Sequence, residues 1–254
     1  MRAIRAIALN TFREAVRDRI LYLLLVFALV MIASSRVVGV LTVGDENKII
    51  KDVGLAAISL FSVLTAIFVG VGLVFKEIER RTVYTVITKP IHRYEFIVGK
   101  YLGLVLTLFV NMSIMTAGYY ALLLIRGAAS LRLLEAIGLS FVEVLVVTAL
   151  AVFFSAFSTP ILSGIFTLSS YVLGHLSWSF LLLRDRIGRG AGAILCEGLY
   201  RVIPNLERFN IKAEVVHGID IPSGQVLWAV LYGLGWVALI LTGAAFAFSR
   251  RDLQ

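Results

Sequence analysis

The chain has 254 residues, of which 59% are hydrophobic and 16% charged, and its formal net charge is +8. Soluble domains carry roughly 45–50% apolar and about 25% charged residues, so this composition indicates a membrane protein. The basic residues lie at the ends of apolar runs, as membrane-flanking Lys and Arg do, and this disfavours nucleic-acid binding. The single cysteine, Cys196, excludes an intramolecular disulfide and a cysteine-based metal cluster.

The basic N-terminal stretch Met1–Arg19 has the pattern of an amphipathic helix. Ile4, Ala8, Phe12 and Ala15 fall near one helical face, and the arginines lie largely elsewhere. Two interpretations stay open: a helix lying on the inner membrane surface, or a plain basic anchor that fixes topology. The apolar run that follows is long enough to span, so the stretch does not resemble a cleaved signal peptide.

Six stretches meet the requirement of about 20 mostly apolar residues for a membrane span. They are Ile20–Leu41, Val53–Phe75, Phe96–Ile125, Leu133–Phe157, Pro160–Leu183 and Gln225–Phe248. No internal repeat or low-complexity linker separates them. We therefore expect an all-α membrane protein with six transmembrane helices in a single domain over residues 1–254, with spans one to five within residues 20–183.

The distribution of basic residues predicts the orientation. Five arginines lie in the N-terminal tail and six Lys or Arg lie between Lys76 and Lys100, whereas the loop after the first span has only Lys48 and Lys51. The positive-inside rule then places the N-terminus and residues 77–95 in the cytoplasm, and six spans return the C-terminus there. Arg126 and Arg132, and the basic residues of the long segment 184–222, fall outside and count against this orientation.

The stretch "EIERRTVYTVITKPIHRYEF", Glu77–Phe96, is a polar segment between the second and third spans. Its first part can form about three helical turns, and Pro90 disfavours helix at Lys89 and breaks the run. A solvated loop is one interpretation. Apolar residues without an obvious core and the mixture of both charge signs favour the other, a specific contact surface.

The segment Arg184–Pro222 is the longest non-spanning part of the chain, and we expect it outside the membrane. Within it, "AILCEGLYRVI" is apolar but too short to cross, and Pro204 ends it. An apolar run of this length is typical of an interfacial or re-entrant segment.

Glu143 lies near the middle of the fourth span, where an ionisable residue costs about 2.5–3.5 kcal/mol on insertion scales and is a functional candidate by default. The alternatives are a hydrogen bond to a neighbouring helix, for example to Asn111, or a protonated carboxyl. The three histidines, His92, His175 and His217, fall at different depths, so we expect no shared metal site.

Enzyme and carrier functions find little support in the sequence. The motifs of intramembrane proteases are missing, and no cluster of carboxylates lies at depth. Secondary carriers often show broken spans and several buried charges, and neither is evident. No P-loop occurs, because Gly99-Lys100 is followed by Tyr101, so we expect no ATP binding by a P-loop of this chain.

Four stretches together resemble the permease subunits of the type-2 ABC transporter family, the exporter-like group. "KEIERRTVYTVITKPIHRYEFIVGKYLG" resembles the family's first coupling segment, and "NTFREAVRDRILYLLL" its amphipathic connecting helix. "IPNLERFNI" resembles an external Pro-Asn-Leu stretch before the sixth span, and "FSAFSTPILSGI" the second cytoplasmic contact. The likeness covers essentially the whole chain, and its specificity lies in the order of the pieces.

The resemblance implies a non-catalytic permease that forms a homo- or heterodimer in a bacterial or archaeal cytoplasmic membrane, with both termini inside. A separate cytosolic ABC ATPase would bind ATP and Mg²⁺ and drive transport, with export favoured. The residues implied to contact that ATPase are Glu77, Glu79, Arg80, Arg81, Val83, Tyr84, Ile87, Lys89 and Arg93. The alternatives are a six-span scaffold, an ATPase-independent carrier or, less favoured, an intramembrane enzyme.

Overall fold

The computed structural model describes residues 2–41, 45–79, 93–187 and 190–249, and these residues form helices joined by short connections, with no strand among them. The expected all-α class is therefore confirmed. The elements are α1 (Arg2–Val16), α2 (Arg19–Leu41), α3 (Glu46–Glu79), α5 (Arg93–Ile125), α6 (Arg132–Ser155), α7 (Pro160–His175), α8 (Ser177–Ile187), α9 (Ala191–Val202), the 3-10 helix η1 (Leu206–Phe209), α10 (Lys212–His217) and α11 (Ser223–Ser249).

Among the described residues, five helices are long and apolar enough to cross a membrane, and each coincides with a predicted span. They lie at Arg19–Val40, Glu46–Gly72, Tyr94–Ile125, Arg132–Ser155 and Gly224–Phe248. These five apolar helices are thus compatible with a multi-pass membrane protein. These helices are apolar around most of their circumference, as helices surrounded by lipid or by other spans must be.

The predicted span Pro160–Leu183 is wrong as one continuous helix. The chain leaves the helix between His175 and Ser177, and α7 and α8 meet there at a bend of 64°. The pair makes a sixth span only if both pieces are counted together. The bent pair has the geometry of a broken span or of a re-entrant loop, and this break is not evident from the sequence.

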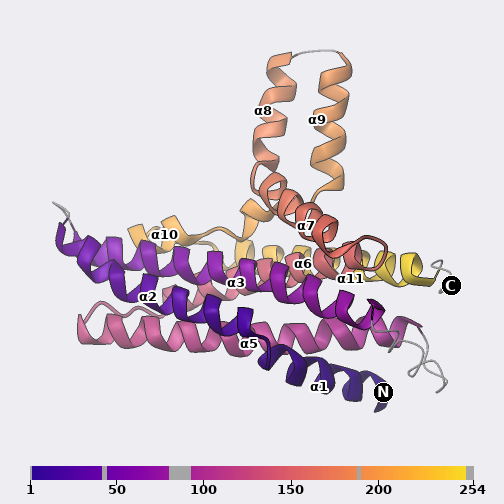
Figure 1. The fold of residues 1–254 in the computed structure, drawn as a ribbon. Helices are drawn as coiled ribbons and strands as arrows, with labels where there is room; N and C mark the ends of the chain where they lie inside the picture. Colours follow the sequence, from indigo (N-terminus) through magenta and orange to yellow (C-terminus); the bar gives the residue numbers. More distant parts are fainter. Residues whose placement is uncertain (1, 42–44, 80–92, 188–189, 250–254) are drawn as a thin grey trace.

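The five long helices run side by side as an elongated bundle (Figure 1). The start of α1, the end of α3, the start of α5 and the end of α11 lie at the same end of this bundle. α3 and α6 form its centre, since 67% of the most apolar stretch of α3 and 72% of that of α6 are buried. α8 and α9 form a hairpin that projects steeply away from the bundle.

Close packing at the centre of the bundle depends on small residues. A Cβ built on Gly54 of α3 would lie 2.2 Å from the ring of Tyr119 of α5, so only glycine lets this ring pack there. The hydroxyl of Tyr119 donates to the carbonyl oxygen of Lys51 at 3.1 Å. A Cβ on Gly233 of α11 would likewise lie 2.4 Å from Cγ1 of Val142 on α6. These contacts join α3 to α5 and α11 to α6.

The N-terminal stretch forms the predicted helix, α1, which packs against the first half of α5. A Cβ on Gly103 of α5 would lie 2.5 Å from both the carbonyl oxygen of Ala8 and Cβ of Thr11, so the two backbones approach closely. Nζ of Lys100 on α5 lies 3.9 Å from Oε2 of Glu14. The apolar face of α1 is therefore covered by a neighbouring helix of the same chain.

Candidate functional site at the break between α7 and α8

Nine residues are expected to contact an ATPase, and three of them belong to described helices. Glu77 and Glu79 belong to the last turn of α3 and Arg93 begins α5, and their side chains lie outside the description. The remaining six lie outside the described residues altogether: Arg80, Arg81, Val83, Tyr84, Ile87 and Lys89. This set stays a prediction.

Glu143, the intramembrane candidate on α6, has no exposed surface and makes a short contact with His175. Its Oε1 lies 2.8 Å from Nε2 of His175, at the end of α7. The partner suggested from the sequence, Asn111, instead donates from Nδ2 to Oγ1 of Thr65 at 3.4 Å. The hydrogen bond between helices therefore exists, but with a different residue.

The other ring nitrogen of His175 extends the contact to a third residue. Nδ1 lies 2.9 Å from Oε2 of Glu207 in η1, and Oε1 of Glu207 accepts a hydrogen bond from Nδ2 of Asn210 at 2.9 Å. The ring of Tyr171, one turn earlier on α7, packs edge-on against the imidazole with centroids 4.8 Å apart. Glu143, His175 and Glu207 thus form one line of side chains, named here the Glu–His–Glu line.

The local fold that builds the Glu–His–Glu line rests on a glycine and a tyrosine. A Cβ on Gly174 would lie 2.7 Å from Cγ of Leu206 and 2.9 Å from the carbonyl oxygen of Pro204, so η1 reaches the end of α7 because residue 174 has no side chain. The backbone N–H of Asn205 donates to the hydroxyl of Tyr232 on α11 at 2.8 Å. These two contacts hold Glu207 opposite His175.

A half-buried lysine supplies positive charge beside the line. Nζ of Lys212 on α10 donates to Oγ of Ser59 on α3 at 2.7 Å. Burial lowers the pKa of Lys212 below its ordinary value, and the charges of Glu143 and Glu207 act against that shift. The negative charges of Glu143 and Glu207 therefore attract the positive charge of Lys212, which belongs to a different helix.

The Glu–His–Glu line does not have the form of a metal site. The two carboxylates contact different ring nitrogens of His175, so the three groups do not converge on one point. In the part of the chain that the structure describes, no group of three or more His, Cys, Asp or Glu residues is placed to hold a metal ion. The arrangement instead suits the holding and passing of protons, since imidazole has one nitrogen toward each carboxyl group.

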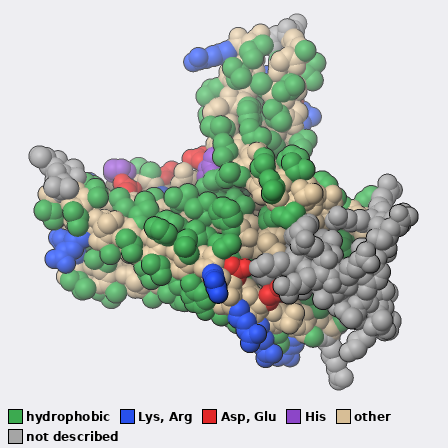
Figure 2. All heavy atoms as spheres, viewed as in Figure 1, with side chains coloured by type: hydrophobic (Ala, Val, Ile, Leu, Met, Phe, Trp, Pro, Cys, Tyr) green, Lys and Arg blue, Asp and Glu red, His purple; other side chains and the backbone are tan. Residues whose placement is uncertain are grey.

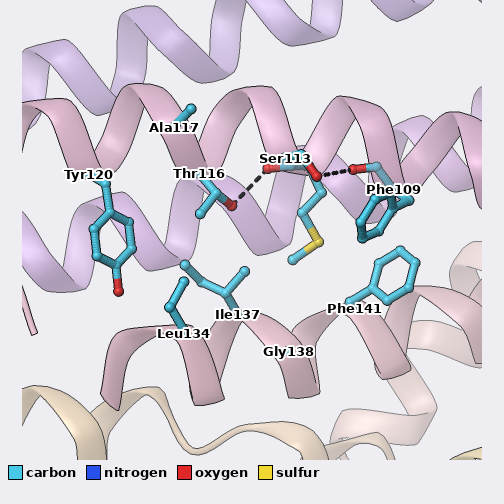
Figure 3. A pocket seen from close by; sticks show the side chains of 10 residues that line it. Phe109, Ser113, Thr116, Ala117, Tyr120, Leu134, Ile137, Gly138 and Phe141 are labelled. Atoms are coloured by element: carbon cyan, nitrogen blue, oxygen red, sulfur yellow. Dashed lines mark hydrogen bonds between the residues drawn. The ribbon is translucent and has the colours of Figure 1, made fainter. Parts of the chain in front are cut away.

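A separate apolar groove of about 440 Å³ lies between α5 and α6, and Figure 3 shows its lining. Phe109, Tyr120 and Phe141 are among the side chains around it, and no charged residue lines it. The hydroxyls of Ser113 and Thr116 donate to carbonyl oxygens of their own helix at 2.7 Å. The groove has no free polar anchor of the kind that fixes the orientation of a ligand.

Comparison with known proteins leaves the family open. No protein-family model matches the chain, and no curated protein shows significant similarity to it. The site therefore has to be interpreted from its own geometry. Of the members of this site, only Glu143 was singled out from the sequence; the histidines were expected to share no metal site, and Glu207 and Lys212 were not singled out.

Proposed function

We propose that the chain is the transmembrane permease subunit of an ATP-driven transporter of the ABC type. The subunit would work as a homo- or heterodimer, with ATP and Mg²⁺ bound by separate cytosolic ATPase subunits and with export as the direction. The observation that carries the proposal is the place of the two helix ends that flank the polar segment Glu77–Phe96. This segment joins α3 and α5 at the end of the bundle where α1 begins and α11 ends (Figure 1).

The helices next to this segment suit the transmission of force. The part of α3 that is apolar enough to cross a membrane ends at Gly72, and the helix continues from there without a break to Glu79. Seven further residues at 1.5 Å each extend the helix by about 10 Å. On the other side, α5 is clamped to α1 through the close approach at Gly99 and Gly103. A partner that moved the segment would therefore move two spans and the N-terminal helix together.

The proposal includes an orientation in a bacterial or archaeal cytoplasmic membrane. The positively charged tail and the segment after α3 belong to one end of the bundle, which we assign to the cytoplasm. The arginines that opposed this orientation have acidic partners at the other end. Arg126 contacts Glu46 at 3.0 Å, and Arg132 contacts Asp220 at 2.8 Å. These two pairs fasten helix junctions.

An ATPase-independent carrier is the second candidate, and one observation favours it. The break between α7 and α8 lies beside two buried or half-buried charged groups, Glu143 and His175. Secondary transporters commonly place broken helices around a site for ions or substrate near the middle of the membrane. No corresponding observation among the described residues favours a six-span scaffold or an intramembrane enzyme.

The experiment that tests the permease proposal is the isolation of the tagged full-length chain from its native membranes. We expect an ATPase with a P-loop to co-purify with the wild-type chain and to hydrolyse ATP. Interface energy is concentrated in a few aromatic and arginine anchors, so replacing Arg81 and Tyr84 by Ala should release that ATPase. The matched control replaces Tyr200 and Arg201 of α9, a second Tyr–Arg pair, and should retain it.

Two results would contradict the proposal in different ways. Retention of the ATPase by the Arg81→Ala/Tyr84→Ala variant would mean that the segment is a solvated loop. ATP hydrolysis by the pure chain alone, or transport by the pure chain without any ATPase, would exclude a subunit driven by a separate ATPase. The last of these results would favour the carrier.

A further inference from the structure

The hydrogen bonds of His175 require more protons than a neutral imidazole supplies. Its two ring nitrogens lie 2.8 Å from Glu143 and 2.9 Å from Glu207. A neutral imidazole has one N–H, and an ionised carboxylate only accepts hydrogen bonds. Both contacts are satisfied only when a second proton is present, either on the ring or on one of the carboxyl groups.

We propose that Glu143, His175 and Glu207 form a proton-binding relay that passes a proton between the half-exposed Glu207 and the buried Glu143. The ligand is H⁺, and the relay goes beyond ATP-driven transport because it needs no ATPase. It holds two protons over three groups in the arrangement described above. The loss of one proton leaves one of the two short contacts without a hydrogen atom and so breaks it.

The transfer itself balances without any additional reactant. The O–H bond of protonated Glu207 breaks and an N–H bond forms at Nδ1 of His175, while the Nε2–H bond breaks and an O–H bond forms on Glu143. The imidazole changes from one tautomer to the other, and the reverse transfer restores it. One proton has arrived on one side of the ring and another has left on the opposite side, while the heavy atoms stay within hydrogen-bond distance of each other.

The exposure of the three side chains falls steadily along the line. Glu207 is 47% exposed, His175 is 23% exposed and Glu143 is fully buried. In the described part of the chain, Oε2 of Glu143 has no hydrogen-bond partner although it is buried. A buried carboxylate oxygen without a partner is costly, and a proton on that carboxyl group removes the charge that makes it so. Glu143 is therefore the inner end of the relay and Glu207 its entrance.

Other titratable and polar groups face the relay from each element packed against it. α10 supplies Lys212, whose Nζ is held by Ser59 of α3, and α7 supplies Tyr171 against the imidazole. Arg208, next to Glu207, instead stacks over the ring of Tyr232 on α11, with Cζ 4.8 Å from the centroid. Figure 2 shows acidic and histidine side chains meeting in the angle between the bundle and the α8–α9 hairpin. Lys212 is thus the cation that balances the carboxylate charge.

The position of His175 couples the relay to the shape of the chain. His175 is the last residue of α7, where the partial negative charge of a helix C-terminus stabilises a protonated imidazole. The residue after it, Leu176, lies in the break from which α8 leaves at 64°. A change in the proton count therefore acts on the contact that joins the end of α7 to α6 and η1.

The test is infrared spectroscopy of the full-length chain in lipid nanodiscs during stepwise changes of pH. We expect a protonated-carboxyl band that follows the pH of the bath, and its loss in the Glu143→Gln variant. His175→Gln should slow the response of that band at least tenfold, because the ring that passes the proton is gone. Free imidazole added to His175→Ala should restore part of the rate. The control Glu135→Gln, in the first turn of the same helix, should behave as the wild type does.

A second measurement needs no substitution, so a variant that fails to fold leaves the proposal testable. Nitrogen-15 NMR of histidine-labelled wild-type chain reports whether the ring of His175 bears one proton or two. A neutral ring together with the absence of any protonated-carboxyl band would mean that the line holds a single proton, and would overturn the proposal. An unchanged response rate in His175→Gln would overturn it as well. Neither outcome bears on the co-purification of an ATPase.

Discussion

Glu143 shows how strongly one buried carboxylate depends on its partner. Replacing His175 by Ala leaves this buried carboxyl group without its hydrogen bond, and an unsatisfied buried polar group costs about 1–3 kcal/mol, more where it is charged. The double variant Glu143→Gln/His175→Ala removes the charge as well, so it should be more stable than His175→Ala alone. Thermal unfolding followed by circular dichroism in detergent measures both. His217→Ala, at an exposed histidine, is the control and should change little. A double variant less stable than His175→Ala would contradict this account.

Lys212 gives a prediction on pH. Burial lowers its pKa in the folded protein below its ordinary value of 10.5. Between the lowered pKa and 10.5 the unfolded chain binds more protons than the folded one, so the free energy of unfolding rises with pH in that window. Lys212→Met should remove this part of the rise, as measured by unfolding at a series of pH values from neutral up to 10.5. Lys48→Met, at an exposed lysine, should retain it; the same pH profile in both variants would assign the rise to other groups.

The contact between α1 and α5 depends on a glycine of α5, Gly103. Gly103→Ala places a methyl group 2.5 Å from the carbonyl oxygen of Ala8, and overpacking of this kind costs about 1–3 kcal/mol. Gly138→Ala on α6 meets no atom within 4 Å, so it should gain about 0.5–1 kcal/mol from the better helix propensity of alanine. Limited proteolysis should cut α1 faster in the first variant and at the wild-type rate in the second. Equal rates would mean that α1 is not held by this contact.

The elements differ in how well a local pattern predicts them. The helices α2, α3, α5, α6 and α11 each follow a long apolar run, and their bounds differ from the predicted spans by only a few residues, except for the longer α3. The run from Pro160 to Leu183 is also long and apolar enough to be predicted as a span, yet it breaks at Leu176. The sequence has no proline at this break that would predict it. Next to this break, Gly174 packs against Leu206 and Pro204, which lie about 30 positions later in the chain.

The orientation of the whole molecule is testable with two cysteines in a Cys196→Ala background. The proposal places the segment after α3 in the cytoplasm and the start of α11 outside. A membrane-impermeant thiol reagent added to intact cells should therefore label Ser223→Cys and should label Thr85→Cys only after the membrane is opened. Labelling in the reverse order would mean that the protein is inverted, and labelling of both from outside would exclude an odd number of crossings between them.

The helical class of this protein follows from its sequence alone. Long apolar runs have to satisfy their backbone hydrogen bonds internally in a membrane, and a helix does so within one segment. The hydropathy of a run and the amphipathic pattern of α1 are therefore local properties of the sequence, and both predict helices that the folded chain contains. The same reasoning singled out Glu143, because a charge in an apolar run is visible without knowledge of its surroundings.

The contacts of Glu143 can be found only in the folded chain. Its partner His175 lies 32 positions away along the chain, and Glu207 lies a further 32 positions beyond that. No local pattern relates these residues, because their meeting depends on the bend after α7 and on the return of η1 to the end of that helix. The physical reason is that hydrogen bonds act over about 3 Å, whereas the sequence records only neighbours along the chain.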